Sequence, residues 1–160
     1  MFQLLNTGEF RGIVLIVVGF LVAHLVNISL PMVNLEYAFV NAAQYFLTED
    51  KLLIDLFFDV QANPVTLSYL ASKIAYIMPD TSLLVIIRGL SVASVIFLTI
   101  GVVNICRFVG RQDHRIIVAL LLFNPLVWTF STRATTDFIS AAVGIFAISI
   151  ALKHEHRTAS

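Results

Sequence analysis

The sequence has few charged residues and a single cysteine. Of its 160 residues, 12% are Asp, Glu, Lys or Arg, about half of the ~25% that an ordinary soluble domain carries. Ten basic residues balance ten acidic ones, so no excess of positive charge suggests nucleic acid as a partner. The lone Cys106 excludes an internal disulfide and a zinc site built from cysteines. Hydrophobic residues make up 59% of the chain and the mean hydropathy is +0.92, which indicates a membrane protein.

Several catalytic patterns are also missing from the sequence. It contains no Ser-His-Asp arrangement, no glycine-rich phosphate loop and no His-Glu-x-x-His motif. It also has no internal repeat and no low-complexity tract. We therefore expect residues 1–160 to form one transmembrane domain.

Four apolar segments have about the length that a helix needs to cross a bilayer. A hydrocarbon core about 30 Å thick requires roughly 17 to 25 apolar residues. The expected spans cover about residues 12–32, 84–106, 116–130 and 136–152. The first span follows Arg11 as in a signal peptide, but no small-residue cleavage site comes after it, so we expect it to be retained. The sequence thus predicts an all-α, polytopic transmembrane protein.

Basic residues are concentrated on one expected side of the membrane. They precede the first span, occupy the link between the second and third spans, and follow the fourth: Arg11, Arg107, Arg111, Arg115, Lys153 and Arg157. The positive-inside rule places these residues in the cytoplasm. Both termini are then cytoplasmic, and the acidic segment of about residues 33–83 is external. We expect the protein to be integral to the cell (inner) membrane.

The external loop predicts two further helices. The segment EYAFVNAAQYFL, residues 36–47, places apolar side chains at helical spacing. Asn63 and Pro64 are typical of a helix start and precede VTLSYLASKIAYIM. Both segments are too polar to span the bilayer but apolar enough to lie on its surface. We therefore expect two amphipathic surface helices in this loop.

Two ionisable residues near the external face are candidates for chemistry. Glu36 is either an acid facing water or a carboxylate that acts as a base or binds a divalent cation. Its neighbour is Asn34 rather than a second acid, which argues against a metal because divalent cations usually take more than one carboxylate. Arg88 interrupts the second span, where a guanidinium requires a partner or access to water. It either reaches the lipid headgroups or binds a phosphate in bidentate geometry.

Other polar residues lie at the ends and breaks of the spans. Arg133 and Asp137 are four residues apart, which favours an ion pair on one helical face; alternatively, they add to a polar floor beneath the external loop. Asn124 and Pro125 interrupt the third span and predict a kink there. His24 lies in the first span, where a hydrogen bond between helices is favoured over a ligand role.

The order of these features carries a family resemblance. Arg88 and Ser91 open a span as R-G-L-S-V, and the basic link is followed by L-L-L-F-N-P-L-V-W-T-F-S-T-R-A-T-T-D-F. Within the latter, Pro125, Ser131, Arg133 and Asp137 match a family motif that follows the third span. The pattern resembles the N-terminal part of GT-C membrane glycosyltransferases, and is similar to bacterial aminoarabinose and protein-mannose transferases over most of the chain.

The resemblance implies transfer of a sugar from a polyprenyl-phosphate donor to an acceptor at the external face. Glu36 would be the catalytic base or the ligand of a divalent cation such as Mg²⁺ or Mn²⁺, and Arg88 would bind the donor phosphate. Arg133 and Asp137 would be supporting polar residues. The family usually carries an acidic pair after the first span, and Asn34 here takes the place of its aspartate. The expected partners are the lipid-linked donor, membrane lipids and, for a partial or divergent enzyme, another membrane subunit.

Two other functions stay open at this stage. Because the loop aspartate is missing, the chain could be a non-catalytic membrane subunit or scaffold that keeps the fold. A third interpretation is a small transporter component in which Arg88 and His24 line a polar path.

Overall fold

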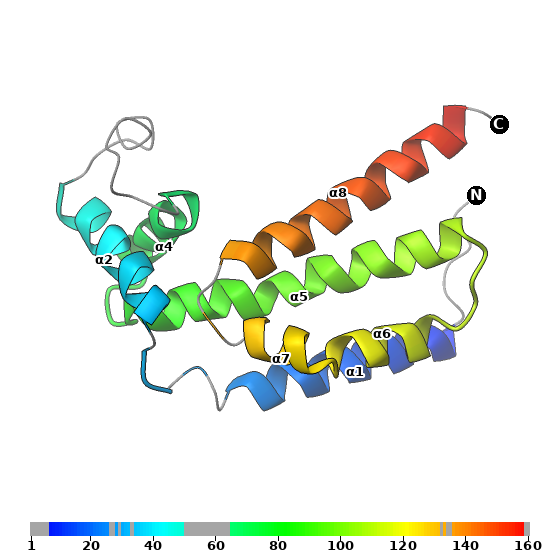
Figure 1. Cartoon of the computed structure of the whole chain (residues 1–160), viewed down its shortest axis with the longest axis horizontal. Helices are drawn as coiled ribbons and strands as arrows, with labels where there is room; N and C mark the ends of the chain where they lie inside the picture. The colour runs from blue at the N-terminus through cyan, green and yellow to red at the C-terminus, as the bar shows by residue number, and fades with distance from the viewer. Residues whose placement is uncertain are drawn as a thin grey trace.

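The computed structural model is all-helical over the residues that it describes (Figure 1). These are residues 7–25, 28, 30–32, 34–49, 65–131, 133 and 136–158. They form seven α-helices and no strand, which confirms the expected all-α class for this part of the chain. The helices are α1 (Thr7–Leu25), α2 (Asn34–Glu49), α4 (Val65–Ile77), α5 (Leu83–Phe108), α6 (His114–Leu122), α7 (Pro125–Ser131) and α8 (Thr136–Thr158).

Three of the described helices are long and apolar enough to cross a membrane. They are α1 over Gly8–Leu25, α5 over Leu83–Phe108 and α8 over Thr136–Lys153. Helices α6 and α7 reach the required length only together, and they meet at an angle of 61°. By length and composition, the chain therefore has three spans, or four if the bent pair counts as one.

The bend between α6 and α7 falls at the expected kink. Pro125 has no backbone N–H and disfavours a helical conformation at the residue before it, so α6 ends and α7 begins anew. The side-chain oxygen of Asn124 accepts a hydrogen bond from the backbone N–H of Leu126 at 2.9 Å, which caps the first turn of α7. The expected span over 116–130 is thus a broken helix rather than a continuous one.

The helices form a bundle with a two-helix cap at one end. Helices α1, α5, α6 and α8 run alongside one another, and α2 and α4 lie together against the beginning of α5 (Figure 1). At the other end of the bundle, α1 begins and α8 ends beside the link between α5 and α6 (Figure 1). The helices expected in the loop are present as α2 and α4, whereas Asn63 and Pro64 lie outside the described residues.

Apolar side chains hold both parts together. The cap packs on α5 through buried residues of α2, α4 and α5: Phe39, Ala43, Leu67, Ala71, Ala75, Ile86 and Ile87. The hydroxyl of Ser68 also donates to the carbonyl of Phe39 at 3.0 Å, which joins α4 to α2. The bundle has its own buried cluster: Ile13, Phe20, Val95, Leu98, Val103, Val118, Leu122, Phe138 and Ala142.

Helices α5 and α8 approach closely at Gly101. A Cβ atom on Gly101 would lie 2.9 Å from Cγ2 of Ile145 and 3.0 Å from the Cα atom of Phe146. Nearby, the side-chain amide of Asn104 donates to the hydroxyl of Ser149 at 3.4 Å. Small residues and polar bonds of this kind favour helix association in a membrane, where burial of apolar surface contributes little.

We predict that Gly101→Ala weakens the contact between α5 and α8. The added methyl group meets backbone atoms of α8, which cannot move aside as a flexible side chain would, so we expect a cost of about 1–3 kcal/mol. Unfolding by SDS in mixed micelles measures it. The matched control is Gly89→Ala on the same helix, where a Cβ meets nothing within 4 Å. Equal midpoints for the two variants would contradict the close contact.

Candidate functional site

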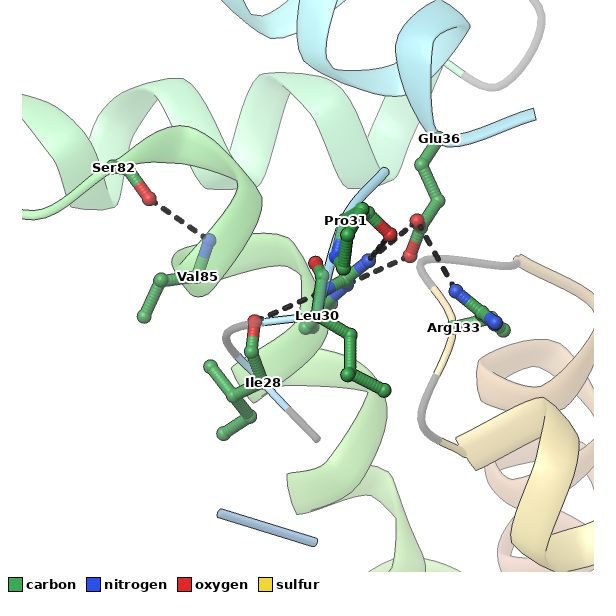
Figure 2. Close-up of polar contacts among 8 residues, drawn as sticks. Ile28, Leu30, Pro31, Glu36, Ser82, Val85 and Arg133 are labelled. Atoms are coloured by element: carbon green, nitrogen blue, oxygen red, sulfur yellow. Dashed lines mark hydrogen bonds and ion pairs between the residues drawn. The ribbon is translucent and has the colours of Figure 1, made fainter. Parts of the chain in front are cut away.

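Three charged side chains from separate parts of the chain meet where α2 joins the bundle. Glu36 lies in the first turn of α2, Arg88 in the second turn of α5, and Arg133 between α7 and α8. The side chains of Glu36 and Arg88 are fully buried, whereas that of Arg133 is 32% exposed. Helix α5 begins immediately before this site, where the hydroxyl of Ser82 accepts the N–H of Val85 at 3.3 Å (Figure 2).

Arg88 and Glu36 form a bidentate ion pair. Nε of Arg88 donates to Oε1 of Glu36 at 2.8 Å, and Nη2 donates to Oε2 at 2.6 Å. Two parallel charge-assisted bonds of this kind match the guanidinium fork to the carboxylate and are among the strongest hydrogen bonds in proteins. The pair therefore joins α2 to α5 across 52 residues of sequence.

Backbone carbonyls complete the environment of Arg88. Nη1 donates to the carbonyl oxygens of Ile28, at 2.9 Å, and Leu30, and Nη2 donates to that of Pro31 at 3.1 Å (Figure 2). Together with Glu36, these acceptors use all five N–H donors of the guanidinium. Arg88 is therefore oriented by protein groups on every side and does not extend toward lipid headgroups.

The carbonyls that bind Arg88 come from a segment that the sequence assigns to the first helix. The sequence predicts a span to about residue 32, but α1 runs from Thr7 to Leu25. The carbonyls of Ile28, Leu30 and Pro31 lie beyond the end of α1 and accept hydrogen bonds from Arg88 rather than from a helix. Backbone acceptors leave no mark in a side-chain pattern, and sequence reasoning missed them. Pro31 was the one local signal that the helix stops short.

Arg133 lies closer to Glu36 than the sequence pattern suggests. Its Nη1 atom is 3.9 Å from Oε2 of Glu36, which makes an ion pair without a direct hydrogen bond (Figure 2). The spacing favoured a helical pair with Asp137, but α8 begins at Thr136, so Arg133 precedes the helix. Asp137 is exposed in the first turn of α8. Arg133 thus belongs to a polar floor under α2, and Asp137 does not join it.

The charges of the site favour an anion over a cation. One carboxylate, Glu36, faces two guanidinium groups, those of Arg88 and Arg133. Both oxygens of Glu36 are bonded to Arg88, and the described residues contain no group of three or more His, Cys, Asp or Glu side chains that could hold a metal. A divalent cation takes several oxygen ligands, so the residues present here do not fit one.

A second buried polar contact ties α1 to the end of α7. Nδ1 of His24 is 2.8 Å from the carbonyl oxygen of Phe20, which can only accept, so Nδ1 carries the proton. Nε2 lies 3.1 Å from the hydroxyl oxygen of Ser131, and that hydroxyl donates to the carbonyl of Trp128 at 3.2 Å. The ring of His24 also stacks on Phe20, with the centroids 3.9 Å apart. The expected hydrogen bond between helices is confirmed, and Ser131 is only two positions before Arg133.

Comparison of the chain with known protein families, curated proteins and solved structures finds no match. The geometry of the described residues is therefore the basis for a functional proposal.

We predict that the Arg88–Glu36 pair behaves as one unit in stability. Glu36→Leu or Arg88→Met alone leaves a buried charge without its partner, which costs about 3–5 kcal/mol. The double variant removes both charges, so its loss should be much smaller than the sum of the single losses. Unfolding by SDS in mixed micelles gives the three values, with Asp80→Asn, an exposed acid before α5, as the control. Additive losses would show that the two side chains do not interact.

We predict a smaller effect for the contact between His24 and Ser131. Ser131→Ala removes the hydrogen bond with His24 and the local one to the carbonyl of Trp128, with little change in volume, and should cost about 0.6–2 kcal/mol. In a His24→Phe background the same substitution should cost less, because the interhelical partner of Ser131 is already gone. The exposed Ser140→Ala on α8 serves as the matched control. An unchanged cost in both backgrounds would exclude the interhelical bond.

Proposed function

We propose that the chain is a membrane glycosyltransferase of GT-C type, partial or divergent, that moves a sugar from a polyprenyl-phosphate donor to an acceptor. The observation that supports it is the convergence of Glu36, Arg88 and Arg133 from three separate segments at one end of the bundle. A carboxylate beside two guanidinium groups supplies both a base and positive charge for a phosphate.

We further propose that this site faces the external side of the cell membrane. The basic link between α5 and α6 lies at the opposite end of the bundle, next to the beginning of α1 and the end of α8 (Figure 1). By the positive-inside rule that end is cytoplasmic, together with both termini. Helices α2 and α4 then form an external cap at the membrane surface.

The donor phosphate enters this site by exchange. All five donors of Arg88 already have protein acceptors, so a phosphate can bind Arg88 only by displacing one of them. Glu36 is the acceptor that a phosphate matches, since both are oxyanions that take a guanidinium in bidentate geometry. Arg133 is partly exposed and lies 3.9 Å from Glu36, so it meets the incoming phosphate first.

Once the phosphate has replaced Glu36 at Arg88, the carboxylate of Glu36 is available as a base. The carboxylate accepts the proton of the acceptor hydroxyl, and the hydroxyl oxygen forms a bond to the anomeric carbon of the sugar. The bond between that carbon and the phosphate oxygen breaks, and the polyprenyl phosphate leaves with the electron pair. Arg88 and Arg133 stabilise the negative charge that develops on the leaving phosphate. No step requires a divalent cation.

A second candidate function is a non-catalytic membrane subunit or scaffold. The observation that favours it is the complete burial of Arg88 and Glu36 together with the full use of the guanidinium donors. In this function the pair only holds α2 over α5, and no ligand displaces Glu36.

The two functions differ in the outcome of a transfer assay. Purified protein is incubated with a radiolabelled polyprenyl-phosphate sugar, and both binding and transfer are measured. For a transferase, Glu36→Gln should lower turnover by about 10²–10⁴-fold, as expected for loss of a general base. Arg133→Gln should raise the donor concentration needed for half-maximal rate, and Asp80→Asn should change neither quantity.

A scaffold gives a different result in the same assay. The wild-type protein then neither binds nor turns over the donor, although its unfolding midpoint still depends on Glu36 and Arg88. Binding that requires Arg133 but is followed by no transfer would support a donor-binding remnant and exclude catalysis by this chain.

A further inference from the structure

A second charged surface lies at the opposite end of the bundle, where α1 packs against α6. The side chain of Arg115 on α6 lies directly over Gly12 on α1. A Cβ atom on Gly12 would be 2.7 Å from Cδ and 3.0 Å from Nε of Arg115. Gly12 therefore leaves the space in which the arginine side chain crosses α1. The preceding residue, Arg11, is exposed beside it.

Two acids at this end are engaged by other residues. Asp113 accepts hydrogen bonds from Arg111 at 3.2 and 3.0 Å. A hydrogen bond from its own backbone, followed by that of Arg111, lowers the pKa of Asp113, so it stays ionised. Glu9 is 4.0 Å from the ring of His114. Within the part of the chain that the structure describes, neither Arg11 nor Arg115 forms an ion pair.

Positive charge is in excess at this end of the bundle. The acids at this end are Glu9, Asp113 and, in the last turns of α8, Glu155. The basic residues are more numerous: Arg11, Arg107, Arg111, Arg115, Lys153 and Arg157. A surface of this composition attracts an anion. Arg11, Arg107 and Arg115 form no ion pair with a described carboxylate, and Arg11 and Arg115 are the two that lie on α1 and α6.

Exposed apolar residues follow the two arginines on the same two helices. Leu15 lies one turn after Arg11 on α1 and is 71% exposed. Ile116 and Leu120 follow Arg115 on α6 and are 61% and 70% exposed. Basic groups at the end of two helices, with exposed aliphatic side chains along the same helices, match the two halves of a phospholipid.

We propose that this α1–α6 surface binds an anionic phospholipid. Its phosphate lies against Arg11 and Arg115, and its acyl chains lie along Leu15, Ile116 and Leu120. This site is separate from the Glu36 cluster, and it holds whether or not the chain is a transferase. A zwitterionic lipid carries its own cation and gains less from the two arginines, so the site selects net negative headgroups.

Native mass spectrometry of the purified chain tests the proposal with phosphatidylglycerol and phosphatidylcholine of identical acyl chains. The wild-type protein should retain phosphatidylglycerol in preference. Arg115→Gln should weaken phosphatidylglycerol binding about fivefold, the effect expected for one arginine at a membrane surface. Gly12→Ala should also weaken it, because the methyl group displaces the Arg115 side chain while its charge remains.

Gly19→Ala is the matched control, since a Cβ on Gly19 of the same helix meets nothing within 4 Å, and it should bind lipid as the wild type does. Equal retention of the two lipids would overturn the proposal. So would Gly12→Ala binding like Gly19→Ala, or displacement of the lipid by inorganic phosphate, which would indicate a site for free anions. If Gly12→Ala unfolds at a lower SDS concentration than Gly19→Ala, its weaker lipid binding could come from lost stability. The proposal is then tested by comparing phosphatidylglycerol binding of Arg115→Gln with that of the wild type.

Discussion

The fold depends on the need to satisfy a buried guanidinium. Arg88 is fully buried near the beginning of α5, where an unpaired charge would be very costly. Its five donors take up the carboxylate of Glu36 and three backbone carbonyls. The carbonyls belong to residues beyond the end of α1 at Leu25, and the carboxylate belongs to the first turn of α2. One side chain of α5 thus bonds both to the residues beyond α1 and to the first turn of α2.

The two ends of the bundle use arginine in different ways. At the cap end, Arg88 is enclosed by acceptors and orders three segments of the chain. At the other end, Arg115 lies over Gly12 with its charge toward the surface. The difference follows from the local supply of acceptors. Carbonyls and a carboxylate surround Arg88, whereas Asp113 pairs with Arg111 and Glu9 lies 4.0 Å from the ring of His114. The first arrangement stabilises the fold, and the second presents charge to a ligand.

The transferase and the scaffold differ in one physical event. In a transferase an oxyanion displaces Glu36 from Arg88, and in a scaffold it does not. A bidentate pair in a dry environment is a stable resting state, and breaking it without a replacement leaves both charges unsatisfied. A phosphate is a suitable replacement because it has the same charge sign and the same geometry toward a guanidinium. Arg133, partly exposed at 3.9 Å from Glu36, gives such an anion a first contact at the edge of the cluster.

Properties that depend on neighbouring residues were determined by the sequence alone. Hydropathy predicts the apolar helices, helical spacing predicts α2 and α4, and the missing N–H of Pro125 predicts the break before α7. Glu36 and Arg88 stand out because charges are rare in such a sequence.

The tertiary structure alone decided the partners of Glu36 and Arg88. Glu36 pairs with Arg88, an arginine 52 residues away. Backbone carbonyls of residues after α1 accept the remaining hydrogen bonds of Arg88. Arg133 lies near Glu36 rather than pairing with Asp137. Contacts between distant segments depend on how the helices pack, and no local pattern encodes which carbonyl remains free.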